Sequence, residues 1–209
     1  MIKQEIVSTV VNRLQKYDKT AKYHKRVVEA ECESVLNQMY NEVFMMSPLS
    51  LQRFVKGYGY TTPLTVLTEV STGIYYTTLP ENIVPIPDKA SGVRRVAPAT
   101  QSGTRFYPVD QREWDLLLSG SFTNFVKNKI GYCVTPTRVE YYGMTGAIIT
   151  SGVRMDLLIP FSEYTDNDVI LVPEHTDKNG MGFIDRIVLR FQERPPVDLS
   201  DDNSDKESK

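Results

Sequence analysis

The chain has 209 residues, which suits one domain with an appended segment and is long enough to bury a core. Its hydrophobic fraction of 41% and charged fraction of 24% are ordinary for a globular protein, and a net charge of −2 excludes an overall basic field for nucleic acid or anionic membranes. The acidic excess lies at the end, because residues 197–209 hold five acidic side chains against two lysines.

The N-terminal sequence MIKQEIVSTVV does not resemble a signal peptide, because Lys3 and Glu5 interrupt it and no long apolar run follows. The longest apolar stretch, about Leu157–Phe161, is far shorter than the ~20 residues that a membrane-spanning helix needs. We therefore expect a protein that is made in the cytoplasm and is not inserted into a membrane.

Two helices are predicted before Pro48. The first covers residues 2–17, and four of its apolar residues follow the spacing i, i+3, i+4, i+7 on one face: Val7, Val10, Val11 and Leu14. The second runs from about Ala21 to Met46, with apolar positions at Val28, Cys32, Val35, Met39 and Val43. Ser47 ends it, because the residue before a proline is disfavoured in the α region. Residues 1–47 are thus expected to form a helical hairpin, which we call the arm, and Met39, Met45 and Met46 to fill its core.

After Pro48 the composition changes to Thr, Tyr, Val and Ile, broken by Gly, Pro and Ser, which is typical of strands and turns. Residues 66–70 and 74–78 predict a β-hairpin, and residues 83–86 and 93–96 flank a longer turn. Prolines at 80, 85, 87 and 98 confine these segments to sheet edges or irregular extended chain. Further strand-like runs lie at 131–134, 138–142, 147–149, 153–160 and 169–172.

Two more helices are expected in this second part. Asp110 stands three residues before Glu113, the spacing of a capping box, and an apolar face with Trp114 as its core anchor follows. The last helix covers about Met181–Gln192, with apolar residues at i, i+3, i+4 and i+7: Ile184, Ile187, Val188 and Phe191.

The sequence therefore predicts an α+β fold in three parts. These are the helical arm over residues 1–47, a mostly antiparallel β-rich body over residues 48–195, and an acidic tail over residues 196–209. The tail is too polar to offset the entropy of ordering, so we expect it to be disordered.

Side chains that carry chemistry are few. Cys32 and Cys133 are too far apart in the sequence for a metal knuckle or a disulfide framework, so buried thiols are expected. His24 reads as part of a solvated helix face. Glu174, His175 and Asp177 form the least implausible acid–base or metal cluster, with a polar loop before a helix as the alternative.

Asp166-Asn167-Asp168 predicts a turn, because it lacks the glycine and the twelfth-position glutamate of a calcium loop. Nucleophile elbows, phosphate loops and dinucleotide fingerprints are missing from the sequence. No catalytic, cofactor-binding or metal-binding residue is therefore predicted, and no cofactor. Arg94-Arg95 is the compact basic pair of the body, and it could contact a DNA backbone, an acidic neighbour or only solvent.

The order of these parts carries a resemblance, together with several turn and strand-end motifs. The motifs are Leu79-Pro80-Glu81, Ile83-Val84-Pro85-Ile86-Pro87, Gly92-Val93-Arg94-Arg95-Val96, Phe106-Tyr107-Pro108-Val109, Leu157-Leu158-Ile159-Pro160 and Asp168-Val169-Ile170-Leu171-Val172-Pro173. With the acidic tail they resemble the ring or adaptor proteins of the head-to-tail connector in crAss-like tailed phages of Bacteroides-type bacteria.

The resemblance implies a virion structural protein without catalytic residues. It implies a homo-oligomeric ring, twelvefold to match the portal, that binds the portal protein and neighbouring ring or tail proteins. Such a ring encloses the DNA channel, where non-specific contact with the exiting DNA is expected. The arm is the candidate for docking to a neighbour, since an amphipathic hairpin can present one face to a partner. The alternative is another head-completion or tail-completion protein without catalytic activity.

Overall fold

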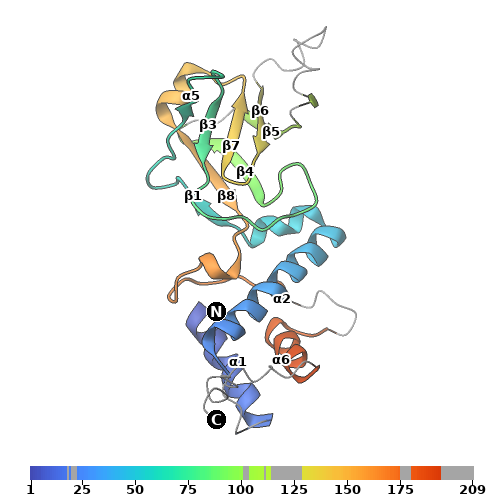
Figure 1. Cartoon of the computed structure of the whole chain (residues 1–209). Coiled ribbons are helices and arrows are strands. Elements are labelled where there is room, and N and C mark those ends of the chain that lie inside the picture. Colours follow the sequence, from blue (N-terminus) through green and yellow to red (C-terminus); the bar gives the residue numbers. More distant parts are fainter. Residues whose placement is uncertain are drawn as a thin grey trace, which may run out of the picture.

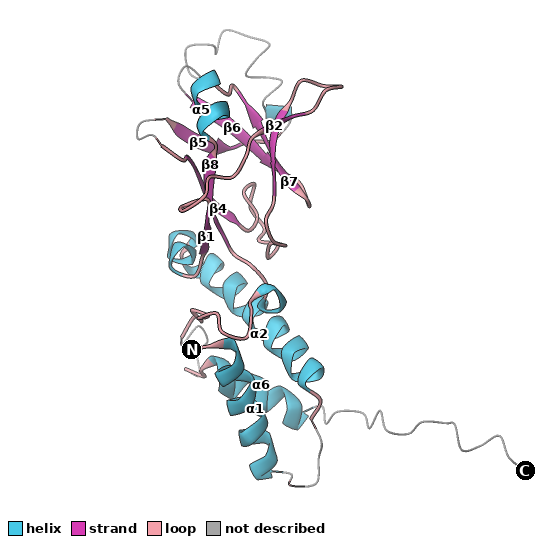
Figure 2. Cartoon of the chain, turned by 90° about the vertical axis from the view of Figure 1, so that its left-hand side faces the viewer, coloured by secondary structure: helices cyan, strands magenta, loops and turns pink. Residues whose placement is uncertain are grey.

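The computed structural model describes residues 1–17, 19, 23–100, 104–110, 112–113, 129–174 and 180–193. The molecule is elongated, with a helical arm at one end and a β-rich body at the other (Figures 1 and 2). In chain order its elements are α1 (Lys3–Tyr17), α2 (Lys25–Met46), η1 (Pro48–Arg53), β1 (Lys56–Tyr58), β2 (Leu67–Thr68), β3 (Tyr75–Thr78), β4 (Val93–Pro98), β5 (Arg105–Pro108), β6 (Lys129–Val134), β7 (Arg138–Tyr142), α5 (Gly146–Ser151), β8 (Val153–Leu157), η2 (Phe161–Glu163) and α6 (Phe183–Glu193). The predicted α+β fold is confirmed.

The arm is a bundle of three helices, because α6 returns from the far end of the sequence to pack against both α1 and α2 (Figure 1). Its buried apolar side chains are Ile6, Val7, Val10 and Leu14 from α1, Val28, Cys32, Val35, Leu36, Met39, Tyr40 and Val43 from α2, and Phe183, Ile187, Val188 and Phe191 from α6. A helix from beyond the boundary predicted at residue 47 therefore packs in the arm as well. The predicted body contained α6, but the apolar face of α6 is buried against the arm.

Charged groups also fix α6. Arg186 donates to Glu42 at 2.7 Å, and Arg190 donates to Ser34 at 2.8 Å. Arg13 of α1 pairs with Asp185 at the start of α6. These contacts surround the apolar seam and set the register of α6 on the other two helices.

The body holds two sheets. Three antiparallel strands make the first, in the order β1-β8-β4, and five strands make the second, in the order β2-β3-β7-β6-β5. Among the described strands only β5 and β6 pair in parallel, so the sheets are mostly antiparallel, as predicted. The predicted hairpin exists, with Leu67 opposite Tyr76 in β2 and β3.

Two glycines let the first sheet meet the chain that follows β1. Leu64 and Val153 exchange backbone hydrogen bonds of 2.9 and 3.0 Å. Gly152 has φ +79°, and a Cβ there would lie 2.6 Å from the Leu64 carbonyl oxygen. Gly59 also has φ +79°, and a Cβ there would lie 2.6 Å from the Val153 carbonyl oxygen. Only glycine combines this conformation with so close an approach of two backbones.

Three strand predictions were wrong. Residues 147–149 lie in the helix α5, which Gly152 ends in a positive-φ conformation. Residues 83–86 form no ladder with β4; Val84 N–H instead donates to the Leu158 carbonyl, and the prolines on either side interrupt regular pairing. Residues 169–172 are also outside the named strands, and Val169 makes a single bridge with Ile2.

Other predictions fall partly or wholly outside the described residues. One half of the predicted capping box is present, because the Asp110 N–H donates to Glu113 Oε2 at 3.2 Å. The rest of that helix, with Trp114, lies outside the described residues, as does the acidic tail over residues 196–209. The second and last helices begin at Lys25 and Phe183 rather than at about Ala21 and Met181.

Candidate interaction surfaces

Large apolar side chains are exposed where α2 ends and η1 begins. Met45 is 79% exposed, Met46 65% and Leu49 74%, and we call these three residues the helix-end patch. Core filling by the methionines was predicted, but it holds only for Met39, which is fully buried. The reason is position: Val43 is the last buried residue of α2, and the helix then runs on beyond the core until Ser47 ends it.

A second exposed apolar group lies on the loop that follows η2. Ile170 N–H donates to the Met1 carbonyl at 2.9 Å, so the extended loop runs antiparallel to the N-terminus. Side chains alternate along extended chain, which buries Ile170 and leaves Val169 63% and Leu171 53% exposed. Ile2, half-buried, is the bridge partner of Val169 and shares its face. We call Ile2, Val169 and Leu171 the loop patch.

Ion pairs hold this loop in place. Lys25 of α2 pairs with Asp166 at 3.2 Å, and Lys56 of β1 pairs with Asp168 at 3.0 Å. The Thr165 N–H donates to Asp168 Oδ2 at 2.8 Å, and this bond, with Lys56, lowers the pKa of Asp168. The Asp168 N–H donates to the Thr165 carbonyl at 3.0 Å, which confirms the predicted turn at 166–168, and lysines pair with its two carboxylates.

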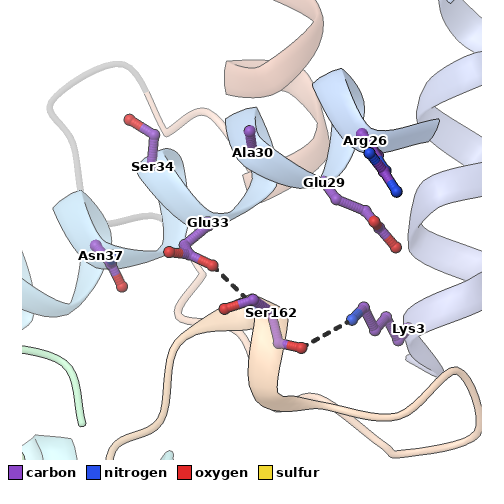
Figure 3. A pocket seen from close by; sticks show the side chains of 8 residues that line it. All are labelled: Lys3, Arg26, Glu29, Ala30, Glu33, Ser34, Asn37 and Ser162. Atoms are coloured by element: carbon purple, nitrogen blue, oxygen red, sulfur yellow. Dashed lines mark hydrogen bonds between the residues drawn. The ribbon is translucent and has the colours of Figure 1, made fainter. Parts of the chain in front are cut away.

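A polar groove of about 420 Å³ separates α2 from α1 and η2 (Figure 3). At its base Lys3 is buried and donates to the carbonyls of Tyr164 at 2.7 Å and Ser162 at 3.3 Å. Glu33 accepts the Ser162 N–H at 3.1 Å. The wall carries Lys3 and Arg26 against Glu29 and Glu33, so the groove favours neither an anion nor a cation.

A larger groove of about 720 Å³ runs between the end of α1 and the face of α6. Its lining combines exposed Tyr17 with Val188 and Leu189, and the paired charges of Arg13 and Asp185 lie beside them. This groove is at the distal end of the arm, away from both apolar patches.

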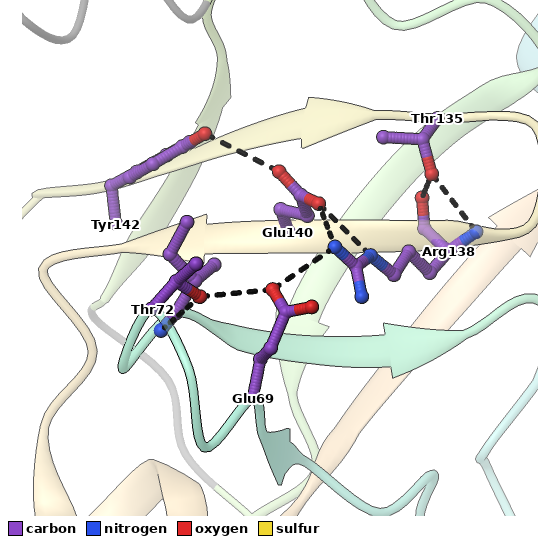
Figure 4. Close-up of polar contacts among 7 residues, drawn as sticks. Glu69, Thr72, Thr135, Arg138, Glu140 and Tyr142 are labelled. Atoms are coloured by element: carbon purple, nitrogen blue, oxygen red, sulfur yellow. Dashed lines mark hydrogen bonds and ion pairs between the residues drawn. The ribbon is translucent and has the colours of Figure 1, made fainter.

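An ion-pair network lies across the five-stranded sheet (Figure 4). Arg138 of β7 bonds Glu140 at 2.9 Å and reaches Glu69 at 3.2 Å, before the β2–β3 turn. Thr72 donates to Glu69, and this bond, followed by Arg138, lowers the pKa of the Glu69 carboxyl. Every carboxylate of the network is paired, so the cluster ties the hairpin to β7 and leaves no spare base for proton transfer.

The two arginines of the predicted basic pair differ. Arg94 is mostly buried, pairs with Asp88 at 2.5 Å and donates to the Pro48 carbonyl at 3.3 Å, so it connects β4 with the start of η1. Arg95 is exposed and stays available to a partner. Contact with DNA is untested for either residue and remains a prediction.

The remaining candidate residues do not come together. Glu174 is exposed, while His175 and Asp177 lie outside the described residues, so the predicted cluster remains a prediction. His24 is exposed at the N-cap of α2. Cys32 is buried in the arm and Cys133 is partly exposed in β6. Burial raises the pKa of the Cys32 thiol to about 12, which keeps it protonated and unreactive.

Within the described residues, no group of three or more His, Cys, Asp and Glu side chains could hold a metal ion. In the same part of the chain, no helix combines the length and the apolar character that crossing a bilayer requires. No protein-family model, curated protein or solved structure matches the chain.

The exposed apolar patches are the features that sequence reasoning missed. A signal for the helix-end patch existed in Met45 and Met46, which follow Val43 without continuing its buried face. Nothing in the sequence pointed to the pairing of residues 168–170 with the N-terminus, which creates the loop patch.

Proposed function

We propose that this chain is a structural assembly subunit that forms a homo-oligomeric ring. The observation that carries the proposal is the presence of two separate exposed apolar groups, the helix-end patch and the loop patch. The first belongs to the end of α2 with η1 and the second to the loop after η2 beside the N-terminus, and these segments lie apart in Figure 1. Clustered exposed apolar side chains mark interaction surfaces. A subunit in a closed ring has two different neighbours and needs two different patches.

The proposed place of this ring is the head-to-tail connector of a crAss-like tailed phage, on the resemblance of the sequence motifs. There the ring would bind the portal protein on one side and the next ring or tail protein on the other. Twelve copies would match the portal and enclose the DNA channel. Exposed Arg95 is the side chain that we assign to contact with exiting DNA or with an acidic neighbour.

Mass measurement of the purified chain, alone and mixed with the portal protein encoded nearest to it, tests this proposal. We expect a complex of about 286 kDa, which is twelve times the 23.8 kDa chain. A portal complex with fewer copies and no ring would favour a head-completion or tail-completion protein. A chain that stays monomeric and binds no connector component would contradict the proposal.

A further inference from the structure

We infer that the carboxyl groups of Glu81 and Glu163 form a pH-sensitive clasp between the body and the arm, closed by a shared proton in acid and loosened by charge repulsion at neutral pH. Glu81 lies in the loop between β3 and β4, and Glu163 is the last residue of η2. The clasp acts within a single chain, so it does not depend on the proposed ring.

The segment η2, orange in Figure 1, lies at the joint between the two regions. It follows the end of β8 and packs against α2, where Glu33 accepts the Ser162 N–H at 3.1 Å. The loop before β4 belongs to the body, because the Val84 N–H donates to the Leu158 carbonyl at 2.9 Å. A contact between this loop and η2 therefore ties the body to the arm.

Two consecutive side chains of the loop reach η2. The Asn82 side-chain amide donates to Glu163 Oε1, and the Glu81 carboxyl lies within hydrogen-bonding reach of the Glu163 carboxyl. Both glutamates are half-buried. Two ionised carboxylates only accept hydrogen bonds and repel each other, so this contact is favourable when one of the two carries a proton.

The groups that face the pair from the body leave it short of positive charge. Lys56 of β1 acts on Glu81, but its ammonium lies 3.0 Å from Asp168 and pairs with that carboxylate. The hydroxyl of Tyr58, also from β1, faces the two glutamates and Asp168, and it has no hydrogen-bond partner within the described residues. One lysine thus faces three carboxylates and pairs with one of them.

The arm reaches η2 mainly through its backbone. Lys3 of α1 donates to the carbonyls of Ser162 at 3.3 Å and Tyr164 at 2.7 Å. Glu33 of α2, which accepts the Ser162 N–H, adds a further negative charge on this side. The surroundings therefore favour a proton on the Glu81–Glu163 pair rather than two separate negative charges.

The sign of the effect follows from the pKa of Glu81. Partial burial and then the contact with Glu163 raise this pKa above its ordinary value, and Lys56 opposes the shift only in part. The protonated form therefore stabilises the fold, completely below the ordinary glutamate pKa, and this contribution is lost as the pH rises through the raised value. Asp168 has the opposite sign, because its pKa is lowered, so the two groups act in separate pH ranges.

Glu81→Gln in the full chain tests the clasp, because glutamine keeps a donor for Glu163 at every pH. Hydrogen exchange of the Val84 N–H, corrected for the intrinsic rate and compared with the amides of β7, reports opening of the loop. In the wild type its protection should be about threefold higher at pH 4 than at pH 7, as a partly exposed pair allows. In Glu81→Gln the protection should be equal at both pH values. Glu174→Gln, at an exposed position in another loop, is the matched control and should keep the wild-type difference.

Carboxyl titration followed by ¹³C NMR gives an independent readout. The pKa of Glu81 should lie above the ordinary glutamate value in the wild type. In Glu163→Gln it should fall toward that value, because the neighbouring side chain no longer carries a charge and can donate to Glu81.

Either of two results would overturn the clasp. One is a Glu81 pKa that is ordinary in the wild type or unchanged in Glu163→Gln. The other is a Val84 protection that depends on pH in Glu81→Gln as it does in the wild type. Neither result bears on the ring, which the mass measurement tests separately.

Discussion

The arm and the body reach a packed core by different routes. In the arm each helix satisfies its backbone hydrogen bonds within itself, and side chains three or four residues apart form the buried face. In the body each strand depends on a partner that is distant in the sequence. Lys56 of β1, for example, lies opposite Leu157 of β8 in the sheet. Local pattern therefore determines the parts of the arm, and long-range pairing determines the body.

The final assembly of the arm is nevertheless also long-range, because α6 joins α1 and α2 from the other end of the described chain. The body closes through backbone contacts that only glycine permits, while the arm closes through a seam of large side chains. Substitutions should consequently act differently in the two regions, by cavity formation in the arm and by backbone strain in the body.

The largest effect is expected from Ile187→Ala in α6. Ile187 is fully buried between the arm helices, so its truncation leaves a cavity and should lower the free energy of unfolding by about 3 kcal/mol. Urea denaturation followed by circular dichroism measures it. Leu189→Ala on the exposed side of the same helix is the control and should cost less than about 1 kcal/mol. Equal losses would mean that α6 is not packed as described.

The matching change in the body is Gly152→Ala. The added Cβ would meet the Leu64 carbonyl oxygen at a positive φ, so we expect a loss of about 2 kcal/mol. Gly146→Ala is the control, because a Cβ there meets nothing within 4 Å at the start of α5. That variant should be neutral or slightly more stable. Thermal unfolding of both variants checks the contrast, and a stable Gly152→Ala chain would argue against the close approach.

Lys3→Met tests the link between α1 and the loop after η2. The variant keeps the length of the side chain but removes the two hydrogen bonds to the Ser162 and Tyr164 carbonyls. We expect a loss of about 1.5 kcal/mol in urea denaturation. Hydrogen exchange should also become faster at Ile170, whose N–H bonds the Met1 carbonyl. Unchanged exchange there would mean that the hydrogen bonds of Lys3 do not hold the loop in place.

The smallest effect concerns pH. The pKa of Asp168 is lowered in the fold by the Thr165 N–H and by Lys56, so its charged form stabilises the protein above the ordinary aspartate pKa. That contribution is lost as the pH falls through the lowered value. At pH 7 Asp168→Asn should cost less than about 1 kcal/mol, because both partners are partly exposed. Denaturation curves at pH 3 should show a smaller difference between the two proteins.

The sequence was sufficient for the helices, because their apolar spacing is local. It was also sufficient for the β2–β3 hairpin and for β7, whose bounds at Arg138 and Tyr142 agree with the prediction. It failed at residues 147–149, where β-branched isoleucines favour a strand but Thr145 and Gly152 bound a helix of 6 residues. Burial against the body, which keeps Ile148 inside, overrides that preference.

The surfaces were harder to predict than the elements. A methionine at the end of a helix looks the same in sequence whether the core continues or stops, so the exposure of Met45 and Met46 required the packing of α2 against its neighbours. Likewise, Val169–Val172 has the composition of a strand. Whether it joins a sheet depends on the partner that reaches it, and within the described part of the chain Val169 bridges Ile2 at the N-terminus.

The return of α6 to the arm also has a consequence for synthesis. A ribosome releases α1 and α2 first and α6 only after the whole body, so the nascent arm exposes the apolar face that later receives Phe183, Ile187 and Phe191. A chain whose translation stops inside the body has no means of covering that face and becomes a substrate for chaperones or proteases. Only chains translated past Glu193 present a finished arm.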